Sequence, residues 1–320
     1  MIKFSSNFAA QIIEFLEYRA AMGIDVRSNE AVLSFFDNYC YEHHPSADKL
    51  TKEIVRGWIS DEVARGRTGL PNKVSGIRMF ARYLGNDSYM VPANLAPRNP
   101  RFTPYILTDD ELLSLFCAVD KTEHKSDPFV RESMLVLLRL IYTSGLRPHE
   151  GRLIKRKNIC FDTGEILIDK AKRRKQRIIV MSSDMLKMCQ SYDVKRNVVA
   201  NGNEYFFVNG KGEEFSLDFL WRWFNRCWAA ANPNTPKNKL PQLRVYDLRH
   251  RFASATMQKW LDEGRNLYTM LPYLRVHMGH ERFVDTAYYI HILPENLLCS
   301  PSVDWDAIDS DVPEVDIWVR

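Results

Sequence analysis

In the stretch HMGHERFVDTAYYIHI, His277 to Ile292, the histidine His280 directly follows a glycine. Two adjacent tyrosines, Tyr288 and Tyr289, come next, near the end of the 320-residue chain. The second of them, Tyr289, follows His280 by nine residues. Taken singly, either tyrosine is explained equally well as a core aromatic. What this stretch means for the fold and for function therefore depends on the residues elsewhere in the chain that accompany it.

Composition indicates a globular protein of about two domains. Hydrophobic residues make up 45% of the sequence and charged residues 26%, which suffices for sizeable cores. The six cysteines are scattered and form no C-x-x-C pair, so we expect thiols in a reducing compartment. Gln11 and Glu14 interrupt the segment where a signal peptide would be apolar, and we find no run of about 18 apolar residues. We expect a cytoplasmic protein without a membrane span.

Positive charge is concentrated in the middle of the chain. The net charge is only +4, but residues 101–298 hold 31 Lys and Arg against 23 Asp and Glu. Residues 299–320 hold one Arg against six acids. The middle region is therefore expected to bind a polyanion, while the acidic end is a different kind of segment. A lysine-rich solvated surface is the simpler alternative for such a mild excess.

The first 85 or so residues are predicted to form about four helices. Phe8, Ile12 and Phe15 show the spacing of an amphipathic helix, and similar patterns follow near residues 31–41, 51–64 and 71–84. The proline-rich stretch NDSYMVPANLAPRNPRFTP resists helix formation and predicts a linker. The predicted boundaries are 1–88 for a helical N-terminal domain, 89–104 for the linker, 105–292 for a second domain and 293–320 for a tail.

The second domain is predicted to be mostly helical with one small sheet. A capping box at Thr108 and Glu111 marks its first helix. KNICFDTGEILID contains two short β-branched runs around a turn, RIIVM (Arg177–Met181) supplies a third strand, and EYFFVNGKGEEFS adds another short one. Helices follow from Ser216 to about residue 291. The predicted fold class is mainly α with a small antiparallel β-sheet, in which the second domain is mixed α/β.

Common nucleotide and metal motifs are absent from the sequence. It contains no G-x-x-x-x-G-K-[ST], no H-E-x-x-H, and no strand followed by G-x-G-x-x-G. His43 and His44 are adjacent but have no partners at metal-ligand spacing. We therefore predict no metal site and no cofactor.

Four separated elements remain as candidates for chemistry. YTSGLRPHE ends an apolar helix with Gly145 as a helix cap and then presents Arg147 and Glu150. DKAKRRKQR packs six basic residues onto a hairpin, YDLRHRF carries Arg249 one turn after Tyr246, and HMGH ends a helix at His280. Each has an ordinary structural explanation when taken singly, such as a surface ion pair or a solvated basic face.

Taken together, the order and spacing of these elements resemble the tyrosine recombinase family of integrase-like DNA strand-transfer enzymes. The family pattern has Arg in a G-L-R-x-x-E turn, Lys on a β-hairpin, H-x-L-R-H, L-G-H, and a tyrosine nine residues later. This chain has GLRPHE, KAKRRKQR, YDLRH, MGH and Tyr289. The resemblance spans roughly residues 105–292 and implies that the helical N-terminal domain is a core-binding domain that clamps duplex DNA.

The resemblance also implies residue roles. The register from His280, with Thr286 and His291 where the family has T-x-x-Y-x-H, selects Tyr289 as nucleophile and leaves Tyr288 as a packing neighbour on the helix. Arginine forks suit transition-state phosphate oxygens, and lysine suits protonation of the leaving oxygen. The predicted catalytic residues are Arg147, Lys172, Tyr246, Arg249, His280 and Tyr289, with Lys175 and Lys170 as alternatives to Lys172. Glu150 is expected to orient Arg147 or His280, and Lys170, Arg173, Arg174, Lys175 and Arg177 to contact DNA.

One departure from the family pattern concerns Tyr246, which stands where the family commonly has histidine. A phenol is a poor base at neutral pH but can donate a hydrogen bond to phosphate. Either Tyr246 only binds the phosphate, which we hypothesise, or another group or water deprotonates Tyr289.

The resemblance predicts a nucleoid-associated, site-specific recombinase that cuts and rejoins DNA through a 3′-phosphotyrosine, without ATP or metal. Its partners would be double-stranded DNA and three further copies of the chain. A catalytically idle DNA-binding protein and a type IB topoisomerase remain alternatives. The tail mixes acids with Leu297, Leu298, Trp305, Ile308, Val315, Ile317, Trp318 and Val319, so we expect it to pack on protein, in cis or in trans. The recognised DNA sequence, and the choice among phage integrase, transposon recombinase and chromosome-dimer resolvase, stay open.

Overall fold

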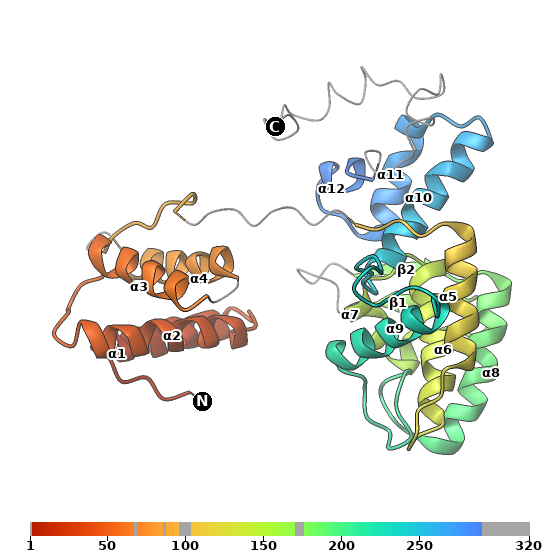
Figure 1. Ribbon diagram of the computed structural model, residues 1–320, viewed down its shortest axis with the longest axis horizontal. Helices are drawn as coiled ribbons and strands as arrows, with labels where there is room; N and C mark the ends of the chain where they lie inside the picture. Colours follow the sequence, from red (N-terminus) through yellow and green to blue (C-terminus); the bar gives the residue numbers. More distant parts are fainter. Residues whose placement is uncertain (1, 67–68, 86–87, 96–103, 170–175, 290–320) are drawn as a thin grey trace. The chain divides into compact units, whose positions relative to one another are not determined.

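The computed structural model describes residues 2–66, 69–85, 88–95, 104–169 and 176–289 (Figure 1). The chain divides into two compact units, Met1–Phe102 and Thr103–Arg320. The described residues form helices and one two-stranded antiparallel sheet. The predicted fold class, mainly α with a small antiparallel β-sheet, is confirmed.

The first unit consists of four helices around an aromatic core. They are α1 (Ala9–Ala21), α2 (Arg27–His43), α3 (Lys52–Ala64) and α4 (Leu70–Leu84), close to the predicted ranges. Helices α2 and α4 each contact the other three. Phe36 and Trp58 meet edge to face at 5.6 Å between ring centroids, an arrangement that aromatic pairs favour. The apolar residues that show amphipathic spacing in the sequence thus lie on the side of each helix that faces this core.

The chain after α4 stays packed on the first unit for several residues. The Tyr89 amide donates to the Leu50 carbonyl at 2.7 Å, and Val91 is buried in the core. Arg78 donates to the carbonyls of Val91 and Pro92. The start of the predicted linker is therefore held against the helical unit, and residues 96–103 of it lie outside the described residues.

The second unit is built around α6, whose buried face includes Met134, Leu137 and Ile141. Its helices are α5 (Asp109–Lys121), α6 (Phe129–Thr143), α7 (Pro148–Arg152), α8 (Ser183–Val199), α9 (Leu217–Ala231), α10 (Asp247–Asp262), α11 (Leu267–Met278) and α12 (Val284–Ala287), with a 3₁₀ turn η1 (Arg156–Asn158). Helix α6 packs against α5, α7, α8 and α10, and α5 lies along α9. The predicted capping box of Thr108 and Glu111 opens α5.

The sheet is smaller than predicted. Strands β1 (Glu165–Ile168) and β2 (Arg177–Val180) pair antiparallel, with Ile168 opposite Arg177. The expected first run contributes only an isolated bridge between Ile159 and Ile166, because a tight turn with Gly164 N donating to Cys160 O follows it at once. The expected strand near residues 205–214 is likewise limited to isolated bridges, so both strand predictions were wrong.

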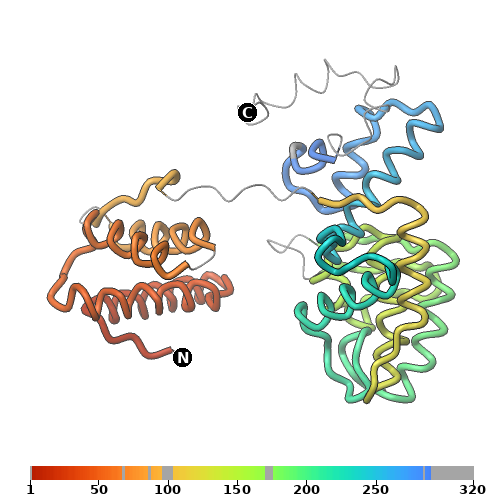
Figure 2. The backbone as a smooth tube through the Cα atoms, viewed as in Figure 1, coloured from red at the N-terminus to blue at the C-terminus, as the bar shows by residue number. Residues whose placement is uncertain are grey.

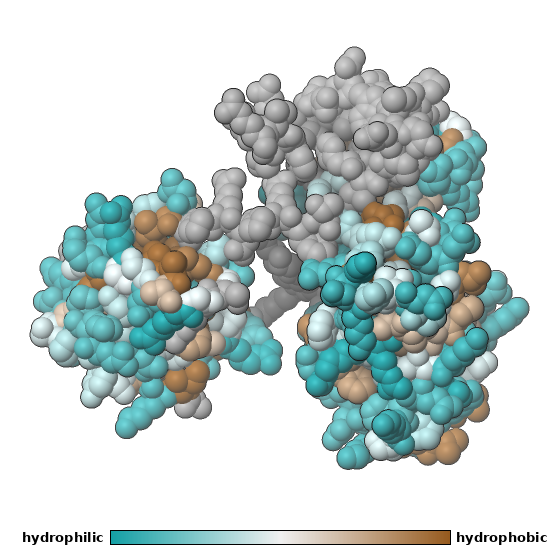
Figure 3. All heavy atoms as spheres, in the orientation of Figure 1, coloured by the Kyte–Doolittle hydropathy of each residue, from teal (hydrophilic) through white to brown (hydrophobic). Residues whose placement is uncertain are grey.

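Helices α10, α11 and α12 gather at one end of the second unit (Figure 2). They share a core cluster that includes Met257, Leu271, Met278 and Tyr289. Among the described residues no helix is both long and apolar enough to cross a membrane. The visible face of each unit is mostly hydrophilic, with hydrophobic residues in separate patches (Figure 3).

Candidate active site

The turn between α6 and α7 can form only with glycine at position 145. Gly145 has φ +58, and a Cβ there would lie 2.4 Å from a ring carbon of Phe252. A positive φ and a close approach together require glycine. The chain then enters α7 with Arg147 as the residue before the helix, whose amide donates to Glu150 Oε2 at 3.0 Å. The sequence GLRPHE thus sets the direction in which Arg147 leaves the backbone.

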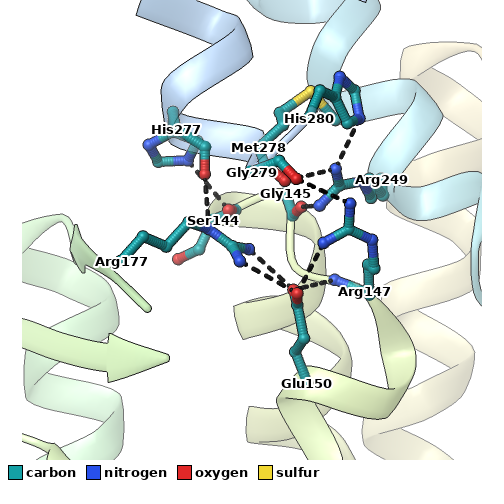
Figure 4. Close-up of polar contacts among 10 residues, drawn as sticks. All are labelled: Ser144, Gly145, Arg147, Glu150, Arg177, Arg249, His277, Met278, Gly279 and His280. Carbon is teal, nitrogen blue, oxygen red and sulfur yellow. Dashed lines mark hydrogen bonds and ion pairs between the residues drawn. The ribbon is translucent and has the colours of Figure 1, made fainter. Parts of the chain in front are cut away.

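Two arginines tie three separate segments together (Figure 4). Arg249, from α10, donates to the carbonyl of Gly145 at 2.6 Å and to that of Met278 at 2.7 Å. Arg147 donates in turn to the carbonyl of Gly279, at the end of α11, at 3.1 Å. Each arginine therefore contacts the glycine turn of another motif, which brings GLRPHE, YDLRH and MGH to one place.

Glu150 is the buried anion of the site. Its carboxylate accepts from Arg147 Nη1 at 2.7 Å and from Arg177 Nη1 and Nη2 at 3.0 and 2.8 Å, and its side chain is 2% exposed. Burial by itself would raise the pKa of Glu150, but the hydrogen bonds and charge of Arg177 and the charge of Arg147 outweigh it and lower the pKa to about 2. The sequence suggested Arg147 or His280 as the partner of Glu150. Glu150 binds Arg147, and it also binds Arg177.

Replacing Glu150 by Gln is expected to lower the free energy of unfolding by about 3 kcal/mol at pH 7, because two guanidinium groups lose a counter-charge that is itself buried. A lowered carboxylate pKa stabilises the fold above the unfolded value near 4.5, and this contribution disappears as pH falls through about 2. The difference between wild type and Glu150→Gln should therefore be constant above about pH 5 and shrink below it. Denaturant unfolding at several pH values measures it.

The matched control is Glu263→Gln, since Glu263 pairs with Lys259 and Arg265 at the surface. Its expected effect is below about 1 kcal/mol. Equal destabilisation by the two variants, or a Glu150→Gln effect that persists undiminished toward pH 2, would contradict the assigned ion pairs.

Arg177 lies at the foot of the hairpin and was predicted to contact DNA. Its side chain is 9% exposed, and besides Glu150 its Nε donates to the carbonyl of His277 at 2.9 Å. His277 Nε2 in turn lies 3.0 Å from the carbonyl of Ser144, and burial lowers its pKa. These contacts are internal, so Arg177 and His277 join β2, α7 and the end of α11. The only sequence signal for His277 was its place one helical turn before His280.

His280 follows Gly279, which ends α11 in the left-handed conformation with φ +64. Its Nε2 lies 2.8 Å from Arg249 Nη2, and its Nδ1 lies 2.8 Å from the Thr286 hydroxyl. Burial and then the charges of Arg249 and Arg147 lower the pKa of His280 to about 3. The ring is therefore neutral at pH 7.

Tyr289 is the more deeply buried of the two adjacent tyrosines, with 2% exposure against a half-buried Tyr288. Its ring stacks on His280 at 5.8 Å between centroids. Burial raises the pKa of Tyr289 to about 12, against the opposing charge and hydrogen bond of Arg249. Helix α12 ends at Ala287, and Tyr289 N donates to Thr286 O at 3.0 Å. The tyrosines thus lie in a turn after α12, not on the helix as predicted.

Tyr246 precedes the first turn of α10 and is half-buried. Burial would lower the pKa of Arg147, but the charge of Glu150 and the hydrogen bond it accepts, and then the charge of Tyr246 and the hydrogen bond it accepts, raise that pKa. The charge of Tyr246 also favours higher pKa values for Arg249 and Tyr289. Two guanidinium groups and two phenols therefore lie within interaction range of one another.

Several predicted residues cannot be placed. Lys170, Lys172, Arg173, Arg174, Lys175 and His291 lie outside the described residues, as does the tail. No group of three or more His, Cys, Asp or Glu suited to a metal ion occurs in the part of the chain that the structure describes.

Residues 106–296 match the phage integrase family. The chain belongs to this family of tyrosine recombinases. The candidate integrase/recombinase y4rE of Sinorhizobium fredii (strain NGR234) is 31% identical over 301 residues, covering 91% of this chain and 93% of the relative. Tyrosine recombinase XerC of Chlamydia trachomatis serovar L2 is 26% identical over 272 residues, covering 81% and 79%. The recombinase described here is therefore an enzyme of the site-specific DNA recombinase class.

Solved structures share the fold of this tyrosine recombinase. The XerH site-specific recombinase bound to its palindromic difH substrate, in a post-cleavage complex, superposes with a TM-score of 0.65 at 19% identity, covering 88% of this chain and 80% of that one. A lambda integrase tetramer bound to a Holliday junction gives 0.58 at 16% identity, covering 88% and 76%. The arrangement of helices around the site is thus that of a tyrosine recombinase.

Proposed function

We propose that this recombinase cuts DNA at a specific site by forming a 3′-phosphotyrosine with Tyr289, and rejoins the strand without ATP or metal. The phenolic oxygen bonds to phosphorus while the bond from phosphorus to the 5′ oxygen breaks, and the 5′ oxygen takes up a proton. A 5′ hydroxyl then attacks the same phosphorus and releases the phenol. The phosphodiester energy is conserved in the covalent intermediate, which splits one difficult step into two easier ones.

The observation that supports this proposal most is that the Tyr289 ring stacks on His280, whose Nε2 lies 2.8 Å from Arg249 Nη2. A phenol beside a fixed cation can be brought to a phosphate that the same cation binds. Arg249 Nε has no hydrogen-bond partner among the described residues, so at least one donor remains for an incoming oxygen. A buried donor without a partner is costly unless a ligand satisfies it.

The second requirement is to stabilise the negative charge of the transition state, and Arg147 and Arg249 meet it. Guanidinium groups keep their charge and donate paired hydrogen bonds to phosphate oxygens. Their carbonyl partners, Gly145, Met278 and Gly279, fix both groups before any DNA binds, so little reorganisation is needed when charge develops. Preorganised donors of this kind typically contribute about 100- to 1,000-fold each in rate.

The leaving 5′ oxygen needs an acid, and Lys172 on the hairpin is the proposed donor, with Lys175 and Lys170 as alternatives. The contacts of Arg177, where the hairpin joins β2, support this assignment. Arg177, the first residue of β2, is tied to Glu150 and to the carbonyl of His277. This end of the hairpin is therefore fixed beside the Arg147–Glu150 pair, and Lys172 lies five residues before it in the sequence.

Tyr246→Phe is expected to slow adduct formation about tenfold while leaving clear activity, because the proposal gives Tyr246 a single hydrogen bond to the phosphate. Single-turnover cleavage of a nicked duplex measures the rate. An unchanged rate would refute the donor role, and complete loss would indicate that Tyr246 instead takes the Tyr289 proton.

Duplex DNA and further copies of the chain are the proposed partners. The related structures contain XerH with its difH DNA and a tetramer of lambda integrase on a Holliday junction. By this likeness the helical N-terminal unit acts as a DNA-binding clamp, four protomers pair two sites, and the acidic, apolar tail docks on protein. The basic excess of residues 101–298 suits a DNA backbone.

The function is tested with a library of nicked duplexes of random sequence. Adducts trapped under denaturing conditions and sequenced give the cleaved site, which is expected to be one defined motif. Two duplexes that carry this motif should then exchange strands. Tyr289-dependent adducts without exchange, accompanied by relaxation of plasmids at many positions, would indicate a topoisomerase, and binding without any adduct would indicate an idle DNA-binding protein.

A further inference from the structure

The His280 ring lies between two hydrogen-bonding partners that together define which nitrogen carries its proton. Arg249 Nη2 is 2.8 Å from Nε2, and Thr286 Oγ1 is 2.8 Å from Nδ1. Arginine can only donate, so Nε2 must accept. In a neutral ring the proton is then on Nδ1, and the Thr286 hydroxyl accepts it.

This arrangement is opposite to the one that the proposed reaction needs. His280 is expected to donate to a non-bridging phosphate oxygen, which requires a proton on Nε2. A doubly protonated ring could donate to the phosphate and to Thr286 at once, but it is disfavoured in the free protein, because burial and the charges of Arg249, Arg147 and Arg177 lower the pKa of His280, with Asp285 opposing them. A neutral ring must therefore change tautomer before it can donate to the phosphate.

We propose that Thr286 is a positioning residue whose hydroxyl accepts from Nδ1 of His280 in the free enzyme and donates to Nδ1 once phosphate is bound. Nε2 of His280 thereby accepts a hydrogen bond from Arg249 in the free enzyme and donates one to the phosphate in the complex. This inference rests on the proposed strand cleavage. The proton balance is neutral, since Nδ1 releases one proton to solvent and Nε2 takes one up when a phosphate oxygen replaces Arg249 Nη2 as the partner of Nε2.

Thr286 is suited to this task by its chemistry and its place. A hydroxyl carries one donor and two acceptor lone pairs, so rotation of a single bond reverses its role. Thr286 is 0% exposed, which keeps water from replacing the hydroxyl. Its carbonyl accepts from Tyr289 N at 3.0 Å, so the same residue holds the backbone of the nucleophile. A threonine is also stiff about χ1, which fixes the direction of its oxygen.

The role is tested first by rates in the full-length enzyme. Thr286→Val, which has the same shape without the hydroxyl, is expected to slow adduct formation on the mapped nicked site about 10- to 100-fold with unchanged DNA affinity. Thr286→Ser restores the hydroxyl and is expected to stay within about threefold of wild type. The matched control is Thr256→Val, because the Thr256 hydroxyl donates to the Phe252 carbonyl of its own helix; this variant should leave the rate unchanged.

The tautomer itself is tested by nitrogen-15 NMR with labelled histidine, using His280→Asn to identify the signals. Free enzyme should show a protonated Nδ1 and a bare Nε2, and Tyr289→Phe enzyme bound to the mapped duplex should show the reverse. A protonated Nε2 in the free enzyme, an unchanged tautomer on DNA, or a Thr286→Ser rate as low as that of Thr286→Val would overturn the inference. Should wild type form no adduct at all, the proposed function fails, while the spectra of the free enzyme still decide the hydrogen bond.

Discussion

Tyr289→Phe should abolish the covalent protein–DNA adduct, with a fall in its rate of formation of at least about 10,000-fold, since loss of a nucleophile removes the covalent route itself. The variant keeps the ring that stacks on His280, so the site should keep its shape. DNA binding is therefore expected to persist. Single-turnover incubation with the mapped nicked duplex, followed by denaturing gel electrophoresis, measures the effect.

Tyr288→Phe is the matched control, because it removes the same atom one residue away. Tyr288 is half-buried and its ring lies 6.4 Å from that of His250. This variant should form adduct at a rate within a few-fold of wild type. If Tyr288→Phe lost the adduct and Tyr289→Phe kept it, the nine-residue register from His280 would select the wrong tyrosine.

Arg249→Lys is expected to lower the rate of adduct formation about 100- to 1,000-fold although the positive charge is retained. One guanidinium contacts the carbonyls of Gly145 and Met278 and also His280 and Tyr289. An ammonium group is a point charge without the planar fork, so it cannot keep these contacts and still bind two phosphate oxygens. Adduct formation at saturating DNA isolates the chemical step.

The control for this variant is Arg251→Lys on the same helix. Arg251 pairs with Asp109 at the start of α5. Its rate should be unchanged. Thermal unfolding of both variants separates lost chemistry from lost folding, because Arg249 is fully buried and its replacement also weakens the packing. Equal rates for Arg249→Lys and wild type would mean that charge alone suffices and that the fork has no role.

Much of the local structure was predictable because its causes are local. Thr108 and Glu111 cap α5 through atoms three residues apart. Gly145 was predicted as the cap after an apolar helix, and its positive φ follows from the lack of a Cβ. Amphipathic spacing located the helices of the first unit for the same reason, since residues on one face of a helix are fixed by its period.

The contacts that organise the site were not predictable, because they join residues far apart in the sequence. Arg177 was predicted to contact DNA from a basic hairpin, yet its partner Glu150 is 27 residues earlier and the His277 carbonyl is 100 residues later. Thr286 matched a family position without a role. Its bond to His280 spans only six residues, but it forms because α12 folds back beside α11, which the local pattern does not fix. Of the predicted strands, those at β1 and β2 formed, whereas the run around Ile159 and the stretch near residues 205–214 gave only isolated bridges, because pairing depends on which partner the turn allows.

The central claim is that Tyr289 forms the bond to DNA phosphorus, and mass spectrometry of the trapped adduct tests it most directly. Digestion of the adduct with protease and nuclease leaves one peptide that carries a short 3′-phosphorylated deoxynucleotide. Fragmentation is expected to place that mass on Tyr289. A nucleotide found on Tyr288, on Tyr246 or on any other residue would contradict the account.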